Sequence, residues 1–158
     1  MIHETADVDP TAVIGEGTKV WHQAQIREGA RVGTNCVIGK GAYIGKDVVV
    51  GDNCKIQNYA CLFRGVRIGN GVFVGPHTCF INDRHPRAVD SSGALMQSDQ
   101  WVAVTTRVGD EVSIGANATI LPGLIIWNDA VIGAGAVVTK EVHAGTTVVG
   151  NPAREVEE

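Results

Sequence analysis

The sequence lacks the patterns that would place a protein in a membrane, in a secretion pathway or on a nucleic acid. No apolar run approaches the roughly 20 residues of a membrane span, and the opening MIHETADVDP is polar and acidic rather than basic and then apolar. The formal net charge is -4, and the 13 Lys and Arg residues are scattered rather than clustered. We therefore expect a cytoplasmic protein whose partners are small molecules or proteins, with no nucleic acid and no membrane.

The sequence does contain a strict period of six residues. An aliphatic residue or Phe occupies every sixth position from Ile2 to Phe80, and the series resumes at Val102 and continues to Val138 with its register shifted by four. This period fits neither an α-helix nor an alternating strand, but it is that of the hexapeptide repeat in a parallel β-helix. The pattern on both sides of the break predicts one domain over residues 1–158, with a C-terminal cap and tail over 144–158.

Two further columns of the repeat support an all-β fold. A small or compact residue, such as Ala, Val, Cys or Thr, stands four places after each aliphatic residue, as a narrow interior requires. Gly recurs one place after the aliphatic residue, and three places after it come Gly, Asn and Asp, which tolerate a positive φ in tight turns. Core pattern and turn chemistry therefore agree hexad by hexad.

Three hexads are expected to make one triangular coil, so that residues eighteen apart stack about 4.8 Å apart on neighbouring rungs. Cys36 and Cys54 form such a pair, as do Cys61 and Cys79. The Cα separations suit a disulfide, but parallel Cβ vectors and a cytoplasmic setting favour free thiols. The cysteines also lack a metal-ligand spacing such as CxxC, so no metal is expected.

The period stops after Phe80, and residues 81–101 are predicted to form an inserted active-site loop. Long loops on rigid scaffolds often carry function, although an ordinary solvated loop is the alternative. The loop begins with five polar or charged residues and a proline within six positions: Asn82, Asp83, Arg84, His85, Pro86 and Arg87. His85 is a candidate base near neutral pH.

Departures from the columns predict that other unusual side chains lie beside this loop. Gln57, Phe63 and Ile81 replace the Gly, and Gln23, Tyr59 and His77 replace the turn residues. Tyr59 and His77 are eighteen apart and are predicted to stack. The residues expected to cluster with the start of the insertion, in two neighbouring coils, are Gln57, Asn58, Tyr59, Arg64 and His77.

The remaining histidines and the tryptophans are weaker candidates. His3, His22 and His143 are interpreted as surface residues. Trp21, Trp101 and Trp127 are expected to cover coil edges or a subunit interface.

Three parts of the chain resemble a known family: the hexads, the stretch CKIQNYACLFRGVRIGNGVFVGPHTCFINDRHPRA at 54–88, and the ending GAGAVVTKEVHAGTTVVGNPAR at 133–154. They resemble left-handed β-helix acetyltransferases, and more narrowly nucleotide-linked amino-sugar N-acetyltransferases. These enzymes acetylate the 3-amino group of UDP- or dTDP-linked sugars for surface polysaccharides. The resemblance covers essentially the whole chain. It implies a left-handed parallel β-helix, a homotrimer with active sites between adjacent prisms, and acetyl-CoA along the later coils.

The resemblance also implies roles for individual residues. Asn58 would face the reacting amine, and His85 would accept its proton. Substrate-binding roles fall to Gln57, Arg64, His77, Asn82, Asp83 and Arg87. The backbone along the pantetheine of acetyl-CoA would be that of Gly115, Ala116, Gly133 and Ala134, with Lys140 and Arg154 at the phosphates and adenine.

The implied reaction is direct attack of the sugar amine on the thioester carbonyl. Three alternatives use the same scaffold. O-acetyl transfer to a sugar or serine hydroxyl needs a stronger base, for which His77 or His85 would serve. A γ-class carbonic anhydrase would bind zinc through paired histidines about five residues apart, whereas His77 and His85 are eight apart. A non-enzymatic β-helix scaffold would not bind acetyl-CoA.

Overall fold

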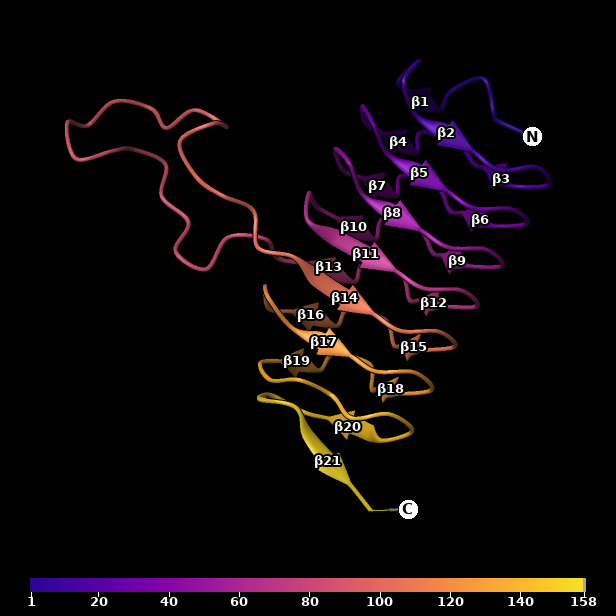
Figure 1. The fold of residues 1–158 in the computed structure, drawn as a ribbon, viewed down its shortest axis with the longest axis vertical. Coiled ribbons are helices and arrows are strands. Elements are labelled where there is room, and N and C mark those ends of the chain that lie inside the picture. Colours follow the sequence, from indigo (N-terminus) through magenta and orange to yellow (C-terminus); the bar gives the residue numbers. More distant parts are fainter. Residues whose placement is uncertain (158) are drawn as a thin grey trace.

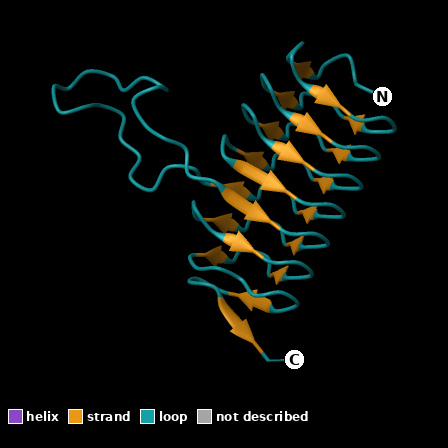
Figure 2. Ribbon diagram, in the orientation of Figure 1, coloured by secondary structure: helices purple, strands orange, loops and turns teal. Residues whose placement is uncertain are grey.

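The chain winds into a three-sided prism of short β-strands (Figure 1). The computed structural model describes residues 1–157, and the regular elements among them are strands of two or three residues (Figure 2). Strands eighteen residues apart pair in parallel, as Asp7 with Gln25 and Lys19 with Val37 illustrate. The predicted parallel β-helix with three hexads in each coil is thus confirmed.

Three sheets form the faces of the prism. Sheet 1 consists of β1 (Asp7–Val8), β4 (Gln25–Ile26), β7 (Tyr43–Ile44), β10 (Cys61–Leu62), β13 (Cys79–Phe80), β16 (Thr119–Ile120) and β19 (Val137–Val138). Sheet 2 consists of β2 (Val13–Ile14), β5 (Arg31–Val32), β8 (Val49–Val50), β11 (Val66–Ile68), β14 (Thr106–Val108) and β17 (Ile125–Ile126). Sheet 3 consists of β3 (Lys19–Val20), β6 (Val37–Ile38), β9 (Lys55–Ile56), β12 (Phe73–Val74), β15 (Ser113–Ile114), β18 (Val131–Ile132), β20 (Thr147–Val149) and β21 (Arg154–Val156).

The turns between the sheets form three edges, which we name by their contents. The cluster edge joins sheet 3 to sheet 1 and contains the turns 21–24, 39–42, 57–60, 75–78, 115–118 and 133–136. The loop edge joins sheet 1 to sheet 2 and contains the turns 27–30, 45–48, 63–65 and 121–124, together with the long segment 81–105. The third edge joins sheet 2 to sheet 3.

The interior is a continuous ladder of aliphatic side chains. In sheet 1, Ile26, Ile44, Leu62 and Phe80 are buried one above another. Burying each such side chain stabilises the fold by about 1.5–3 kcal/mol. The small-residue column is buried as well, and Ala60 illustrates it at the cluster edge. The predicted core columns are therefore confirmed along the prism.

The turn residues adopt the backbone conformation that their types predict. Asn35 has a φ of 53°, Asp47 of 56° and Gly41 of 63°. Tyr59 and His77 occupy the same position in their hexads, and each has a φ of 59°. The columns therefore change side chains here without changing the backbone.

The insertion changes the pairing register but leaves the prism continuous. Arg67 pairs with Val49, eighteen residues earlier, and with Arg107, forty residues later, so the insertion adds twenty-two residues to one coil. In Figure 1 it leaves the prism between β13 and β14 and extends away from the coils. The predicted return of the repeat at Val102 is wrong, because that side chain is 86% exposed and the ladder resumes with buried Thr106 and Val108.

The C-terminal residues extend sheet 3. β20 pairs with β18 in parallel, and β21 turns back to pair with β20 antiparallel. Throughout the described chain, no helix has the length and apolarity needed to cross a membrane.

Candidate functional site

The cluster edge presents Asn58 from a turn whose backbone is held on both sides. Its Oδ1 accepts a hydrogen bond from Lys40 N at 3.0 Å, and its backbone oxygen accepts one from His77 N at 3.0 Å. Gln57, beside it, is half-buried, while Asn58 is exposed. The Asn58 side chain is therefore fixed toward the coil above, with its amide nitrogen available to a ligand.

An aromatic stack borders this turn. The rings of Tyr59 and His77 have centroids 5.2 Å apart at an interplanar angle of 20°, which confirms the predicted stack. Gly41 lies under the tyrosine, and a Cβ there would stand 2.4 Å from Tyr59 Cε1. Gly41 thus has two reasons to lack a side chain, its positive φ and the ring above it.

Further along the same edge, the turns consist mainly of Gly and Ala, so that the backbone is not covered by large side chains. The predicted acetyl-CoA residues Gly115, Ala116, Gly133 and Ala134 lie in consecutive turns below His77. A Cβ at Gly115 would stand 2.4 Å from Ala134 N, so the coils approach too closely for a side chain there. This part of the cluster edge is a strip with no large side chain, which suits an extended ligand against the backbone.

The base of the insertion is fastened at the loop edge. Asn82 Nδ2 donates to Arg64 O at 3.0 Å, and Asn82 O accepts from Val104 N at 3.3 Å. Asn82 and Arg64 are eighteen residues apart, so they belong to the same edge on neighbouring coils. Asn82 therefore closes the loop where its two arms meet.

Asp83 shapes the next turn and so places His85. Asp83 Oδ1 accepts a hydrogen bond from His85 N at 2.9 Å, which forms a tight side-chain turn. The imidazole of His85 is exposed, as is Arg87 two residues later. His85 is thus presented to solvent from a turn with a defined backbone.

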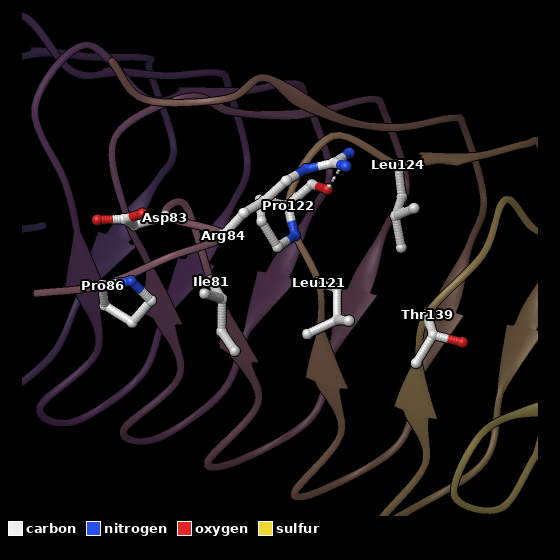
Figure 3. Close-up of a pocket in the computed structure, with 8 residues that line it drawn as sticks. All are labelled: Ile81, Asp83, Arg84, Pro86, Leu121, Pro122, Leu124 and Thr139. Carbon is white, nitrogen blue, oxygen red and sulfur yellow. Dashed lines mark hydrogen bonds between the residues drawn. The ribbon is translucent and has the colours of Figure 1, made fainter. Parts of the chain in front are cut away.

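A pocket of about 290 Å³ lies where the loop meets the coils below it (Figure 3). Arg84 reaches across this pocket and donates from Nη2 to Pro122 O at 3.3 Å. A Cβ at Gly123, which has a φ of +80°, would stand 2.8 Å from the same nitrogen. The residues that line the pocket are Ile81, Asp83, Arg84, Pro86, Leu121, Pro122, Leu124 and Thr139.

Sequence reasoning missed the half of this pocket that comes after the insertion. Leu121 and Thr139 stand one place after the aliphatic residues Ile120 and Val138, in the column that elsewhere holds Gly. Before the insertion, the same column identifies Ile81 as a residue that replaces Gly. The same reading after the insertion would have found Leu121 and Thr139.

The tip of the insertion has its own local structure. Asp90 Oδ1 accepts hydrogen bonds from Ser92 Oγ at 2.6 Å and Ser92 N at 2.8 Å. These bonds, the Ser92 hydroxyl first, lower the pKa of the Asp90 carboxyl. Val89 and Leu95 form an antiparallel bridge across the turn, and Leu95 is 70% exposed. The tip therefore carries an uncovered apolar surface.

The thiols lie in two stacked pairs. Cys61 and Cys79 are register partners in sheet 1 and face outward, and burial raises the pKa of both. Cys36 and Cys54 are buried, and Cys54 N donates to Cys36 Sγ at 3.4 Å. All four are free thiols.

Lys140 and Arg154 meet at the last coil, where both line a smaller pocket of about 150 Å³. They are separate from the strip at Gly115 and Gly133, because Lys140 follows β19 on the loop edge. The structure thus brings these two cations together, but within one chain they do not lie on the same edge as the strip.

One sequence prediction is wrong within a single chain: the loop does not cluster with Asn58 and His77. The loop follows β13, whereas Asn58 precedes β10, so sheet 1 lies between the loop edge and the cluster edge. The hydrogen bonds that fasten the loop run to Arg64 and Pro122. The same separation places His77 and His85 on different edges, and residues 1–157 contain no group of three His, Cys, Asp or Glu placed to hold a metal.

Comparisons with known proteins agree with this architecture. The family model described as bacterial transferase hexapeptide (six repeats) matches residues 11–46, 35–64 and 105–140, more than half of the chain. A Schizosaccharomyces pombe protein assigned as an acetyltransferase is 35% identical over 102 residues, which are 63% of this chain and 47% of the relative. The galactoside O-acetyltransferase of Escherichia coli is 30% identical over 93 residues, 59% of this chain and 44% of that enzyme. In both of these relatives, the matched segment is less than half of the relative's own length.

One solved structure shares the fold along nearly the whole chain. It is a variant of perosamine N-acetyltransferase from Caulobacter crescentus in complex with CoA and GDP-perosamine. The TM-score is 0.60 at 23% sequence identity, and the match covers 99% of this chain and 56% of that one.

Proposed function

The chain belongs to the bacterial transferase hexapeptide family, and from this we propose that it is an N-acetyltransferase. It transfers the acetyl group of acetyl-CoA to the amino group of a UDP- or dTDP-linked amino sugar, with the 3-amino group as the expected position, in surface-polysaccharide biosynthesis. The observation that carries the proposal is the bare strip of Gly115 and Gly133 on the same edge as Asn58. The perosamine enzyme, which has this fold, holds CoA and a nucleotide-linked amino sugar.

Acetyl-CoA is placed along the bare strip. Its pantetheine arm needs close contact with backbone, which the glycine and alanine turns allow because a Cβ at Gly115 would collide with the next coil. Lys140 and Arg154 are separate from the strip of their own chain, so those of the neighbouring copy supply positive charge for the phosphates. The thioester then lies toward the upper end of the strip, near His77 and Asn58.

The acceptor sugar is placed against the turn that holds Asn58. Gln57 and Asn58 offer amide groups to the sugar, and the Tyr59 and His77 rings form a flat wall beside it. Arg64 or Arg87 meets the nucleotide phosphates, because a guanidinium donates two parallel hydrogen bonds to phosphate oxygens.

The loop completes the site from a neighbouring copy. One chain holds Asn58 and His85 on different edges, so a complete pocket needs the cluster edge of one subunit and the loop edge of another. A homotrimer with threefold symmetry repeats this contact three times and closes the ring. Asn82, Asp83 and His85 then border the sugar held by the partner.

The reaction is a direct transfer. The amine lone pair forms the new C–N bond to the thioester carbonyl, a tetrahedral oxyanion forms, and the C–S bond then breaks. The proton lost by the amine goes to His85, which then gives it to the departing thiolate, so that CoA leaves as its thiol. Holding amine and thioester in contact supplies much of the rate enhancement, because a bimolecular step becomes effectively unimolecular.

The test is a thiol-release assay with acetyl-CoA and a panel of UDP-, dTDP- and GDP-linked amino sugars. The matched control for each substrate is the same nucleotide sugar with a hydroxyl in place of the amine. We expect CoA release with an amino sugar and none with its hydroxyl control. Absence of release from every amino sugar, together with no thermal shift on adding CoA, would favour the scaffold function instead.

O-acetyl transfer is the second candidate, because the galactoside enzyme matches 59% of this chain. It predicts the opposite result in the matched pairs. Release of CoA with the hydroxyl sugars, and with serine or galactosides, would favour it.

A further inference from the structure

Two arginines stand side by side on the outer face of sheet 2. Arg67 of β11 and Arg107 of β14 are register partners in parallel strands, and both are exposed. Register partners project to the same side of a sheet, about 5 Å apart. Among the described residues, the ion pairs join Glu28 to Arg27 and Lys46, so neither of these guanidinium groups has a carboxylate partner. Like charges in this arrangement repel each other unless an anion lies between them.

An open groove runs from these arginines to an exposed tryptophan. Arg67, Arg107, Ile125 and Trp127 all line it, and its volume is about 350 Å³. Trp127 is 45% exposed, and its Nε1 donates a hydrogen bond to Glu141 Oε1, which fixes the indole. The groove therefore combines two unpaired cations with one immobilised aromatic ring.

Trp127 stands where the repeat would accept glycine. It comes one place after Ile126, and at the same place on the third edge the two preceding coils hold Gly109 and Gly69. A bulky aromatic residue half exposed at such a position is not needed by the core. Its exposed ring is therefore available to a ligand.

We infer that this groove binds a nucleotide, with its phosphate oxygens between the guanidinium groups of Arg67 and Arg107 and its base on the indole of Trp127. Paired guanidinium groups match the oxygens of a phosphate, and an indole face stacks with any base. The volume falls in the range of small-molecule sites. Two carboxylates of the adjoining turns are already engaged, Asp110 by Asn70 N and Glu141 by the indole.

This site is separate from the proposed acetyl-transfer pocket. Arg67 and Arg107 belong to sheet 2 and Trp127 begins a turn of the third edge, whereas Asn58 lies on the cluster edge. The inference therefore does not depend on the proposed function. Acetyl transfer by a variant without the two arginines is expected to stay within about twofold of the wild type.

The experiment compares binding of inorganic pyrophosphate and of ADP to the whole protein by calorimetry. In the double variant Arg67→Gln and Arg107→Gln, we expect the Kd for pyrophosphate to rise at least about tenfold, as loss of charge-assisted hydrogen bonds predicts. The matched control is Arg31→Gln, because Arg31 is exposed on the same face but separated from Arg67 by Val49. That control is expected to bind pyrophosphate as the wild type does.

The base contact is tested separately with Trp127→Leu. We expect this variant to keep its affinity for pyrophosphate but to lose about fivefold or more in affinity for ADP, the loss of one stacked base. Unchanged pyrophosphate binding in the double arginine variant would overturn the site. An equal loss in Arg31→Gln would also overturn it, since the effect would then be diffuse charge, and unchanged ADP binding in Trp127→Leu would remove the base contact.

Discussion

The cluster edge and the loop edge border the same sheet, yet they depart from the repeat in different ways. At the cluster edge the turns keep four residues from 21–24 to 133–136, and only side chains change, as at Tyr59 and His77. At the loop edge the turn between β13 and β14 grows to residues 81–105. The first edge holds groups at fixed positions set by the coil, whereas the second carries groups away from the coils (Figure 1).

The substitutions at the cluster edge have a measurable cost. A non-glycine residue in the left-handed region costs about 1–2 kcal/mol, and the bulky side chains of Tyr59 and His77 are both held there. Their stacking offsets part of this cost. The same positive φ occurs on the other edges, as at Asn35 and Asp47, so the cluster edge is distinguished by its bulky side chains and not by its backbone.

The largest effect on acetyl transfer is expected from deleting the insertion, which would make the loop edge as regular as the cluster edge. Deleting residues 82–103 removes twenty-two residues and restores the eighteen-residue register between β11 and β14. We expect acetyl transfer to fall by at least about 10³-fold, because in the proposed site the loop supplies one wall and the proton acceptor. CoA binding, measured by thermal shift, is expected to persist. A deletion variant that retained full turnover would place the insertion outside the site.

His85→Asn is the sharper test of the loop. We expect kcat to fall by about 10²-fold or more, since an amide cannot accept the amine proton. The matched control is His3→Asn, which changes a histidine of the first coil, where its ring stacks on His22. Unchanged turnover of a confirmed amino-sugar substrate by His85→Asn would end the assignment of His85 as general base.

Stability is expected to separate the coil from the insertion. Ile114→Ala removes a buried side chain of β15 and should lower the free energy of unfolding by about 2–5 kcal/mol. Leu95→Ala removes a side chain that is 70% exposed at the loop tip and should change it by less than about 0.5 kcal/mol. Urea denaturation measures both. Equal effects would show that the tip packs on the prism in solution.

The smallest effect is a pH response confined to the loop tip. Hydrogen bonds from Ser92 hold the pKa of Asp90 below its ordinary value of 3.8, so their contribution is complete above that pH and is lost as pH falls through the lower folded value. Asp9 makes the same bonds with Thr11, but its turn belongs to the coil. We expect acid to lower the protection factor of the Ser92 amide, which is its intrinsic exchange rate divided by its observed rate, and to leave that of the Thr11 amide unchanged. An equal loss of protection at both turns would contradict this contrast.

Most of the fold could be predicted from the sequence because each column has one physical cause. The core ladder, the positive φ of Asn35 and the stack of Tyr59 on His77 all follow from residues eighteen apart sharing an edge. The prediction that the repeat resumes at Val102 failed, because the presence of a Val at the right spacing does not show that its side chain is buried in a coil. The repeat constrains residues inside coils and says little about an arm that leaves them.

The site was predicted less well, for a reason that the same spacing explains. Arg64 and Asn82 are eighteen apart and do meet, whereas Asn58 and Asn82 are twenty-four apart and lie on different edges. Neighbouring coils were not enough to predict contact. The pocket residues Leu121 and Thr139 were missed because the glycine column was read only before the insertion.

The most direct test of the account is complementation between two inactive variants. Asn58→Ala damages the cluster edge and His85→Asn damages the loop edge. If each site combines these edges from two subunits, random mixing by unfolding and reassembly should restore about one quarter of wild-type turnover. Half of the subunits have an intact cluster edge and the other half an intact loop edge, so both edges are intact at about one site in four. Mixed samples that stay as inactive as the two separate variants would contradict a shared site.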